Sequence, residues 1–295
     1  MSYEAHAAFV APARGKPQLW RFVVGLVLIM VIILGLTALY QAAVLRLGGT
    51  ALHRDITRLE GAGSTPAGVM VLLYSFLIMI LATAVVTAQL HNRSPLTLLG
   101  PLPQMLRQFG ATMAVLIALG LAITVLPPWG YADPLIPGVP PMLWLLLLPL
   151  SLTAVLVQTS AEEILFRGYI QQQLAARFAS PLIWMVAPAV IFGLLHYRPD
   201  AGANGGLIML WAAGFALAAA DLTARAGTLG PAIALHFMSN TSALLFLAAD
   251  GTLSGLALFR LQVDMPDTEA LRPYLMIDAS VILVGWLAAR VAIRR

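Results

Sequence analysis

Residues 141–170 read PMLWLLLLPLSLTAVLVQTSAEEILFRGYI, and this stretch decides how the chain must fold. No side chain from Met142 to Ala161 carries a charge, and a helix of that length can cross the apolar interior of a bilayer. Two adjacent carboxylates, Glu162 and Glu163, follow at once, with Arg167 four residues later. A membrane helix that ends in ionisable groups needs partners for them or a cavity that they face.

The composition of the whole chain is that of a membrane protein. Of its 295 residues, 60% are hydrophobic and only 10% are charged, and the mean hydropathy is +0.88. A soluble domain carries about 25% charged residues. The isoelectric point near 9.8 comes from basic residues dispersed among loops and chain ends, which does not indicate a nucleic-acid partner. The absence of cysteine excludes disulfides and a cysteine nucleophile.

Apolar segments predict an all-α fold, a polytopic transmembrane helical bundle with about eight spans, in which residues 1–295 form a single integral membrane domain. The expected spans are Phe22–Leu45, Ala67–Leu90, Phe109–Leu126, Met142–Ala161, Leu182–His196, Gly206–Ala220, Ala232–Ala249 and Tyr274–Ala292. The proline-rich connection 127–141 and the segment Asp250–Pro273 are expected to be the two large extramembrane loops.

The distribution of lysine and arginine predicts the orientation in the membrane. With eight spans and a cytoplasmic N-terminus, eleven of the 17 basic residues lie on the cytoplasmic side and six lie outside. Both termini are therefore expected in the cytoplasm. The alanine-, leucine- and arginine-rich chain looks bacterial, which predicts the bacterial inner (plasma) membrane as its location.

Eight ionisable or amide side chains in or near the spans are candidate functional residues, because each costs a few kcal/mol unless it is paired or faces a cavity. They are Glu162, Glu163, Arg167, His196, Asp221, His236, Asn240 and Asp278. Glu163 and Arg167 are four residues apart, so on a helix they share a face and can pair. Glu162 has Leu165 and Phe166 at the corresponding positions and hence no basic partner. The two aspartates are interpreted as helix-end charges near the membrane surface.

Spacing along a helical hairpin brings the glutamates level with a histidine. The segment Arg177–Pro181 is predicted to be the tip of the hairpin, because proline can open a helix and disfavours helix in the residue before it. At 1.5 Å per residue, Glu163 lies ~27 Å before this tip and His196 lies ~22 Å after it. His236 follows shortly after the start of the seventh span, which begins at the same end. We expect a shared site that opens toward the cytoplasmic side.

Three motifs at these positions resemble those of one protease family. They are Glu162-Glu163-Ile-Leu-Phe-Arg167, Phe192-Gly-Leu-Leu-His196 and His236-Phe-Met-Ser-Asn240. In this order they resemble the Glu-Glu-x-x-x-Arg, Phe-x-x-x-His and His-x-x-x-Asn motifs of the CPBP family of intramembrane proteases, also called the CAAX-protease, Abi or bacteriocin-processing family. The resemblance covers roughly residues 142–245, the expected catalytic core. The first three spans and the last are matched by hydrophobicity alone.

The resemblance implies an intramembrane endopeptidase that cleaves a membrane-associated protein or peptide with an activated water. Carried over to this chain, Glu162 would be the base that takes a proton from the water. His196 would hold or share that water. His236 and Asn240 would donate hydrogen bonds to the oxyanion of the tetrahedral intermediate. No cofactor is expected for this mechanism.

The remaining motif residues are expected to support the site. Glu163 and Arg167 would form a structural ion pair, which lets the helix tolerate the second carboxylate, and Phe192 would be further support. Eukaryotic relatives in the family remove the last three residues of prenylated proteins. For a bacterial chain the expected substrates are a peptide precursor, a sorting-signal tail or a membrane regulator.

Two alternatives stay open at the level of sequence. Glu162, His196 and His236 could form a three-ligand zinc site with an open position, although the chain has no His-Glu-x-x-His helix. The same cluster could serve a membrane transporter or scaffold by carrying protons or binding a partner. Asn240 distinguishes a hydrolase from a transporter or scaffold, because an oxyanion site needs a fixed donor at that position and a proton path does not. We favour a metal-independent hydrolase.

Overall fold

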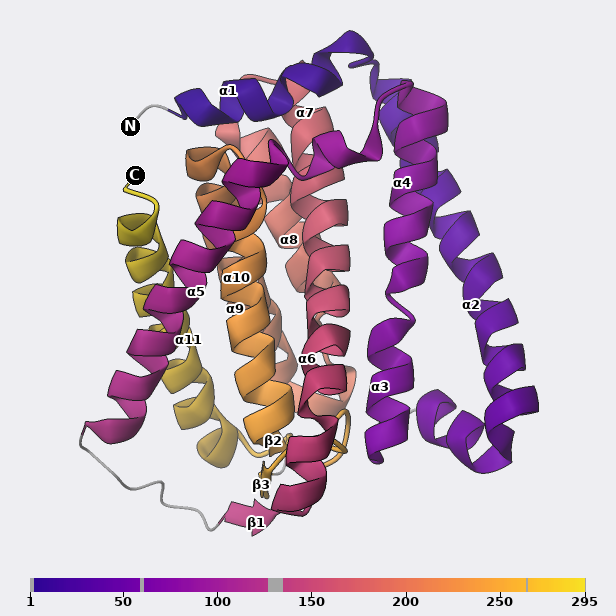
Figure 1. Cartoon of the computed structure of the whole chain (residues 1–295), viewed down its shortest axis with the longest axis vertical. Coiled ribbons are helices and arrows are strands. Elements are labelled where there is room, and N and C mark those ends of the chain that lie inside the picture. The colour runs from indigo at the N-terminus through magenta and orange to yellow at the C-terminus, as the bar shows by residue number, and fades with distance from the viewer. Residues whose placement is uncertain (1–2, 59–60, 127–134, 264, 295) are drawn as a thin grey trace.

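The computed structural model describes residues 3–58, 61–126, 135–263 and 265–294, and over these ranges the chain is a bundle of helices with one small sheet at its end (Figure 1). The prediction of an all-α helical bundle is therefore confirmed, with the sheet as an addition. The helices are α1 (Glu4–Val10), α2 (Leu19–Thr57), α3 (Pro66–Tyr74), α4 (Leu77–His91), α5 (Leu102–Val125), α6 (Pro141–Glu163), α7 (Gln172–Arg177), α8 (Ala187–Leu195), α9 (Gly205–Ala226), α10 (Gly230–Thr241) and α11 (Thr268–Ala292).

Among the described residues, six helical segments are long and apolar enough to cross a membrane. They are Leu19–Thr57, Pro66–His91, Pro95–Val125, Pro141–Arg177, Pro199–Ala226 and Glu269–Ala292. The predicted fifth span is the shorter apolar helix Leu182–Leu195, and the predicted seventh span is centred on the 12-residue helix α10. The number of eight spans is thus approximate, since two of the eight segments are shorter than a full crossing.

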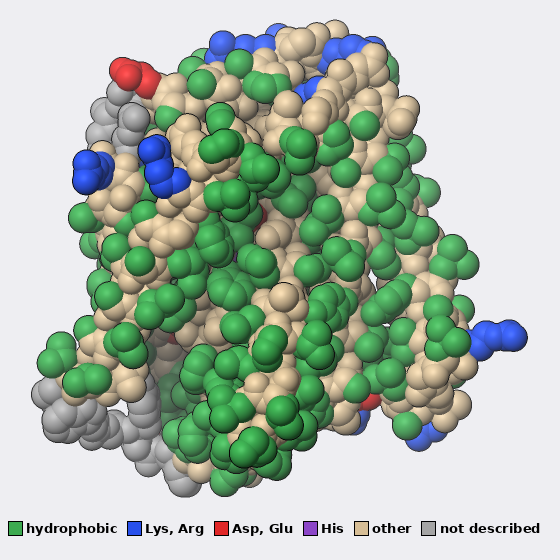
Figure 2. Space-filling view, in the orientation of Figure 1, with side chains coloured by type: hydrophobic (Ala, Val, Ile, Leu, Met, Phe, Trp, Pro, Cys, Tyr) green, Lys and Arg blue, Asp and Glu red, His purple; other side chains and the backbone are tan. Residues whose placement is uncertain are grey.

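The surface of the bundle is suited to lipid. Large apolar side chains point outward along its whole length, among them Leu34 at 63% exposure, Leu146 at 69% and Met276 at 71%. Figure 2 shows these apolar side chains over the middle of the molecule and most of the visible Lys and Arg side chains toward the end that carries both termini. A soluble protein would not expose so much contiguous apolar surface, so the chain is an integral membrane protein.

The C-terminal part of the seventh predicted span forms a strand instead. The helical stretch that begins with α10 ends at Phe246, and Leu247–Ala249 (β2) pairs in parallel with Phe259–Leu261 (β3). Leu135–Pro137 (β1) pairs with the other edge of β3 in antiparallel fashion, which gives the sheet order β1-β3-β2. The prediction of helix up to Ala249 was wrong because a short apolar run suits a buried strand as well as a helix.

Both predicted large loops are shorter than expected where the structure describes them. The first is predicted over 127–141; residues 127–134 lie outside the described ranges, and β1 follows. The second is predicted to run to Pro273, but α11 begins at Thr268. The Asp267 side chain caps this helix by accepting hydrogen bonds from the backbone N–H groups of Glu269 (2.9 Å) and Ala270 (3.1 Å). This cap starts the helix before the proline, which then lies inside it.

The predicted second span is broken into α3 and α4 at Ser75 and Phe76. The hydroxyl of Ser75 donates to the carbonyl of Leu72 at 2.6 Å, a local bond of the kind that competes with regular helix. The break lies beside a cavity of the bundle that Ser75 and Phe76 help to line.

A buried cluster at the end with the termini joins three elements. Asp221 near the end of α9 accepts two hydrogen bonds from Arg225, both at 2.8 Å. It also accepts from the Tyr3 hydroxyl beside α1 and from the indole Nε1 of Trp286 on α11, both at 2.9 Å. The interpretation of Asp221 as a plain helix-end charge therefore understates its role, because this carboxylate is only 8% exposed and links α1, α9 and α11.

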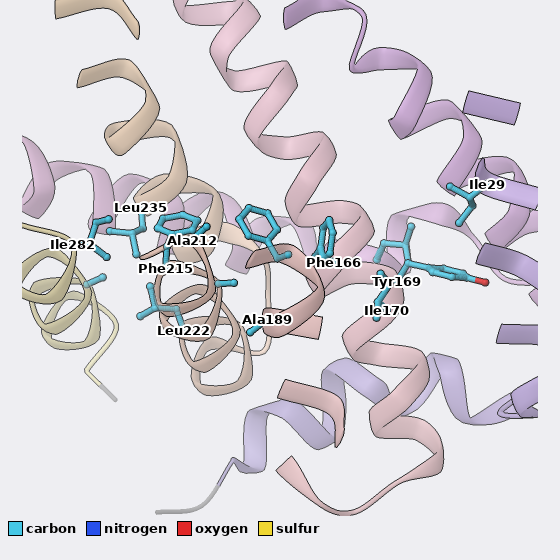
Figure 3. Close-up of a cluster of buried hydrophobic side chains, with 14 of the residues drawn as sticks. Ile29, Phe166, Tyr169, Ile170, Ala189, Ala212, Phe215, Leu222, Leu235 and Ile282 are labelled. Atoms are coloured by element: carbon cyan, nitrogen blue, oxygen red, sulfur yellow. The ribbon is translucent and has the colours of Figure 1, made fainter. Parts of the chain in front are cut away.

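The core of the bundle surrounds the helix that runs from α6 into α7 (Figure 3). Between α6 and α7 the chain passes through a π-helical stretch, Ile164–Gln171, and Phe166 and Tyr169 from this stretch are buried in the core. The Tyr169 hydroxyl bonds to Nε2 of His91 on α4 at 2.9 Å. This tyrosine hydroxyl lies only 1.9 Å from the position that a Cβ at residue 25 of α2 would occupy. Helix α2 can therefore approach Tyr169 only because residue 25 is glycine.

Two loops meet at the end of the bundle opposite the termini. The backbone N–H of Leu253 donates to the carbonyl of Ala62 at 2.8 Å, and that of Gly255 donates to the carbonyl of Gly63 at 3.1 Å. A Cβ at Gly255 would lie 2.4 Å from the backbone of Thr65, so this position admits no side chain. The two loops are therefore closely docked over one end of the helices.

The helical hairpin provides a test of orientation. The tip of the hairpin lies between α7 and Leu182, as the sequence predicts, and Ala179 is exposed there. Ala203, also exposed, lies at the opposite end, next to Asn204, which donates to the backbone of Met265 and Asp267 just before α11. With both termini cytoplasmic, a membrane-impermeant thiol reagent on intact cells should label Ala203→Cys and not Ala179→Cys. The chain has no other cysteine. The reverse labelling pattern would contradict the cytoplasmic placement of the termini.

Candidate active site

The site begins with an ion pair that has almost no contact with solvent. Nη1 of Arg167 donates to Oε1 of Glu163 at 2.9 Å, as the four-residue spacing predicts, and the two side chains are 3% and 0% exposed. Nη2 of Arg167 donates to the carbonyl of Ala216 on α9 at 3.0 Å. The pair thus satisfies two buried charges and also fixes α6 against α9.

Glu163 has a second partner on a third helix. Nδ1 of His236, on α10, lies 2.8 Å from the same Oε1 that accepts from Arg167. A carboxylate oxygen can only accept, so Nδ1 of His236 carries the proton and donates it. The imidazole is 4% exposed and is further held by the edge of Phe215, whose ring centroid lies 4.8 Å away. Glu163 therefore sets the orientation and tautomer of His236, a role that sequence did not reveal.

His196 is held by the turn that precedes it. Its Nδ1 lies 2.8 Å from the carbonyl of Phe192, so Nδ1 donates and Nε2 is left as an acceptor in the neutral ring. The ring stacks on Phe192 with 4.3 Å between centroids. The guanidinium of Arg167 lies 5.1 Å from the centre of the same phenyl ring, within cation–π range. Phe192 thus separates the ion pair from His196 and supports both.

Glu162 points away from the ion pair, as its position on the helix predicts. Its Oε1 accepts a hydrogen bond from Nε2 of Gln158 at 2.6 Å, and Oε1 of Gln158 accepts from Nδ2 of Asn240 at 2.7 Å. Oε2 of Glu162 is buried without a hydrogen-bond partner and lies 3.7 Å from Nε2 of His236. One oxygen of this carboxylate is therefore fixed and the other is available.

These groups meet at the wall of one cavity of about 490 Å³. Glu162, His196, His236 and Asn240 line it, so the structure brings together all four residues predicted to be catalytic. The rest of the wall is mainly apolar. It comes from α3 and the α3–α4 break, from α9, from the segment after α10 and from two loops. Its apolar residues include Leu72, Leu73, Phe76, Trp211, Phe215, Leu244 and Leu253. A cavity with a small polar constellation on an apolar wall has the form of a ligand or substrate site.

The direction of the cavity differs from the expectation. Besides the polar groups, its lining includes Ala62, Thr252 and Leu253, which belong to the two loops docked at the end opposite the termini (Figure 1). No lining residue belongs to α1 or α7, at the end with the termini. This lining favours an opening toward the end opposite the termini, whereas the sequence led us to expect the side of the termini, because helix spacing fixes depth and carries no information about which loops reach the site.

Gln158 is the site residue that sequence reasoning missed. It is 6% exposed and connects Glu162 to Asn240 through its amide. It stands four residues before Glu162 on α6, so the rule that already paired Glu163 with Arg167 would have placed it on the face of Glu162. Gln158 lies outside the three motifs, so the resemblance to the protease family did not indicate it.

The positions of the site's side chains limit how they could bind a zinc ion. Within the described ranges, no three His, Asp or Glu side chains are grouped so that they could hold one metal ion. Nδ1 of His236 and Nδ1 of His196 are both engaged by protein acceptors, which leaves only their Nε2 atoms for a ligand. The predicted ligand set Glu162, His196 and His236 would therefore need side-chain movement to close on a metal.

Comparison with known proteins found one similar family. The described site combines buried carboxylates, imidazoles and amides at a cavity inside the helical bundle. Residues 142–242, about a third of the chain, match the family model described as type II CAAX prenyl endopeptidase, Rce1-like, which supports the resemblance to the CAAX protease family. The match contains Gln158, both glutamates, Arg167, both histidines and Asn240, whereas part of the cavity wall, including Leu72 and Leu253, lies outside it. Neither the curated proteins nor the solved structures gave a match to the chain.

The two glutamates are expected to differ in their effect on stability. Glu163→Gln leaves Arg167 buried without its counter-charge, and breaking such a pair costs ~3–5 kcal/mol. Glu162→Gln retains the amide oxygen that accepts from Gln158, so its melting temperature in detergent should stay close to that of the wild type. Adding Arg167→Met to Glu163→Gln removes the stranded charge and should recover most of the lost stability. Thermal unfolding of the four proteins in one detergent measures this. A destabilised Glu162→Gln beside a stable Glu163→Gln would reverse the assignment of the two carboxylates.

Proposed function

We propose that the protein is an intramembrane endopeptidase in which Glu162 activates a water molecule to cleave a membrane-associated protein or peptide. One observation carries the proposal. Oε2 of Glu162 is buried, has no hydrogen-bond partner and lies 3.7 Å from Nε2 of His236 at the wall of the cavity. A carboxylate oxygen held in this way is suited to accept a proton from a water in the cavity.

The two histidines supply different groups to the reaction. His196 presents Nε2 as an acceptor, because its Nδ1 is committed to the carbonyl of Phe192. It can therefore hold one hydrogen of the water while Glu162 takes the other. His236 donates from Nδ1 to Glu163, and when Nε2 also carries a proton the ring can donate from Nε2 into the cavity.

The bonds exchanged in the reaction follow from these positions. The water oxygen attacks the carbonyl carbon of the substrate while Glu162 takes its proton. The oxyanion that forms accepts a hydrogen bond from the amide of Asn240 and from protonated His236. When the C–N bond breaks, the proton on Glu162 passes to the leaving amine, and the products are an amine and a carboxylic acid, which then releases its proton to solvent. Glu162 ends in its starting state.

The walls of the cavity indicate the substrate class. They are largely apolar, and the bundle presents lipid-facing side chains on its outside. A segment that is itself apolar and tethered to the membrane would reach this cavity without leaving the bilayer. The family named by the match acts on prenylated CAAX proteins; for this chain we propose the broader class of membrane-tethered peptides, in a bacterial inner membrane with both termini in the cytoplasm.

The alternative of a proton-conducting transporter or scaffold is less well supported. Asn240 is not a titratable group, and its amide is fixed by Gln158 with its nitrogen facing the site. A proton path has no use for a fixed amide donor beside its carboxylate, whereas oxyanion stabilisation requires one.

The base is tested by Glu162→Gln. This change keeps the size of the side chain and its bond to Gln158 but removes the ability to take a proton. The variant should fold, bind a membrane-tethered peptide and fail to cut it. Proteomics of the termini of membrane proteins, with wild type and with Glu162→Gln, should then reveal the natural substrates as termini that only the wild type generates. Cleavage by Glu162→Gln at the wild-type rate would exclude this residue as the base.

The oxyanion assignment is tested by Asn240→Ala. Loss of one oxyanion donor is expected to lower kcat by ~10²–10³-fold with little change in KM. A strong chelator should leave wild-type turnover intact, because the proposed base needs no metal. Full turnover of Asn240→Ala on a verified substrate would contradict the role of Asn240. Loss of activity in chelator that zinc restores would instead favour the zinc site at Glu162, His196 and His236.

A further inference from the structure

We infer that Gln158 is a positioning residue that aligns the proposed base with the proposed oxyanion donor. The inference rests on the proposed function and deepens it. Gln158 lies outside the three sequence motifs, yet its amide contacts a residue of the first motif and a residue of the third, 82 positions away along the chain. No other described side chain is hydrogen-bonded to both of these residues.

The amide of Gln158 fixes which atom of each neighbour faces the cavity. Its Nε2 donates to Oε1 of Glu162, so this oxygen is occupied and Oε2 is left to receive a proton. Oε1 of Gln158 can only accept a hydrogen bond, so Asn240 must turn its Nδ2 toward that oxygen. Since an amide nitrogen carries two hydrogens, Asn240 keeps a second N–H for the substrate. Without Gln158 the Asn240 amide could rotate and present its oxygen to the oxyanion.

Burial makes this arrangement specific. Gln158 is 6% exposed, and a buried amide is stable only when its polar atoms are bonded. Both its nitrogen and its oxygen are bonded, at 2.6 Å and 2.7 Å. The direction of the chain, from Asn240 to Gln158 to Glu162, cannot be reversed while Glu162 is an anion, because a carboxylate has no proton to donate.

The glutamates thus have parallel arrangements with different partners. Each has one oxygen, Oε1, engaged in hydrogen bonds, and a second oxygen, Oε2, buried without a partner. Glu163 is held by a cation, Arg167, whereas Glu162 is held by a neutral amide. A neutral partner fixes the position of Glu162 without neutralising it, which suits a group that must accept a proton.

Gln158→Met tests this role, because it keeps the length of the side chain and removes both hydrogen bonds. We expect kcat to fall by roughly 10²-fold, the loss typical of a reacting group misplaced by about 1 Å, while KM and the melting temperature change little. Gln173→Met is the matched control. Gln173 is a buried glutamine on the same continuous helix, its Nε2 has no hydrogen-bond partner among the described residues, and it does not line the cavity. This control should retain wild-type kcat.

Gln158→Glu provides a second measurement, the pH dependence of turnover, which a merely structural role would not change. A protonated carboxyl group at this position can donate to Glu162 and accept from Asn240, as the glutamine does. An ionised one would repel Glu162. Two neighbouring carboxyl groups share one proton at acidic pH and lose it as the pH rises. The variant should therefore approach wild-type turnover at acidic pH and lose it at higher pH, where the wild type stays active.

The outcomes separate this inference from the proposed function. If Glu162→Gln is inactive and Gln158→Met turns over at the wild-type rate, Gln158 has no positioning role although the base assignment stands. If Gln158→Glu follows the pH dependence of the wild type, the inference is also overturned. If Glu162→Gln itself remains active, the proposed function fails first.

A double-mutant cycle tests the link between Gln158 and Asn240. The fold loss in kcat for Gln158→Met combined with Asn240→Ala should be much smaller than the product of the two single losses, because both changes act on the same donor. Independent losses in kcat would contradict the link.

Discussion

The site depends on the neutralisation of one carboxylate in a place that water does not reach. Glu163 has no exposed surface, and its Oε1 receives hydrogen bonds from Arg167 on its own helix and from His236 on α10. A charge buried in this way is tolerated only when its partners are in place. Because these partners belong to different elements, and Arg167 also donates to α9, forming the ion pair sets the positions of three helices at once. His236, the proposed oxyanion donor, is then oriented as a consequence of satisfying a buried charge.

The second carboxylate is arranged differently because it serves a different purpose. Glu162 lies about 100° around the helix from Glu163, which turns it to the cavity. Its partner there is an amide, and Nε2 of His236 is 3.7 Å away. An enzyme that needs both a stable helix and a reactive carboxylate inside a membrane can obtain them from adjacent residues, provided that only one of them has a cation beside it. The adjacent pair Glu162 and Glu163 follows this scheme.

Local rules explain what could be predicted from the sequence. Apolar runs located the helices, and the four-residue spacing paired Glu163 with Arg167, because both signals depend only on helix geometry. Contacts between distant segments were out of reach of such rules. The bond from His236 to Glu163 joins residues 73 positions apart, and no local pattern indicates it. The strand at Leu247–Ala249 continues an apolar run that reads equally well as helix. The direction of the cavity depends on loops at 61–65 and 250–255, whose docking rests on backbone hydrogen bonds and on the missing side chain of Gly255, which no local pattern indicates.

The contact between Tyr169 and Gly25 has a consequence for the size of the working unit. The region that matches the protease family covers residues 142–242, and α2 lies wholly outside it. Yet the Tyr169 hydroxyl, two turns beyond Glu163 on the site helix, fills the space that a side chain at residue 25 would take and bonds to His91 on α4. The N-terminal helices are therefore shaped to the helix that carries the carboxylates. A fragment limited to the matching region would leave a tyrosine hydroxyl without its histidine, beside the helix that carries Glu162 and Glu163. A chain that keeps these contacts must be longer than the segment that matches the family model.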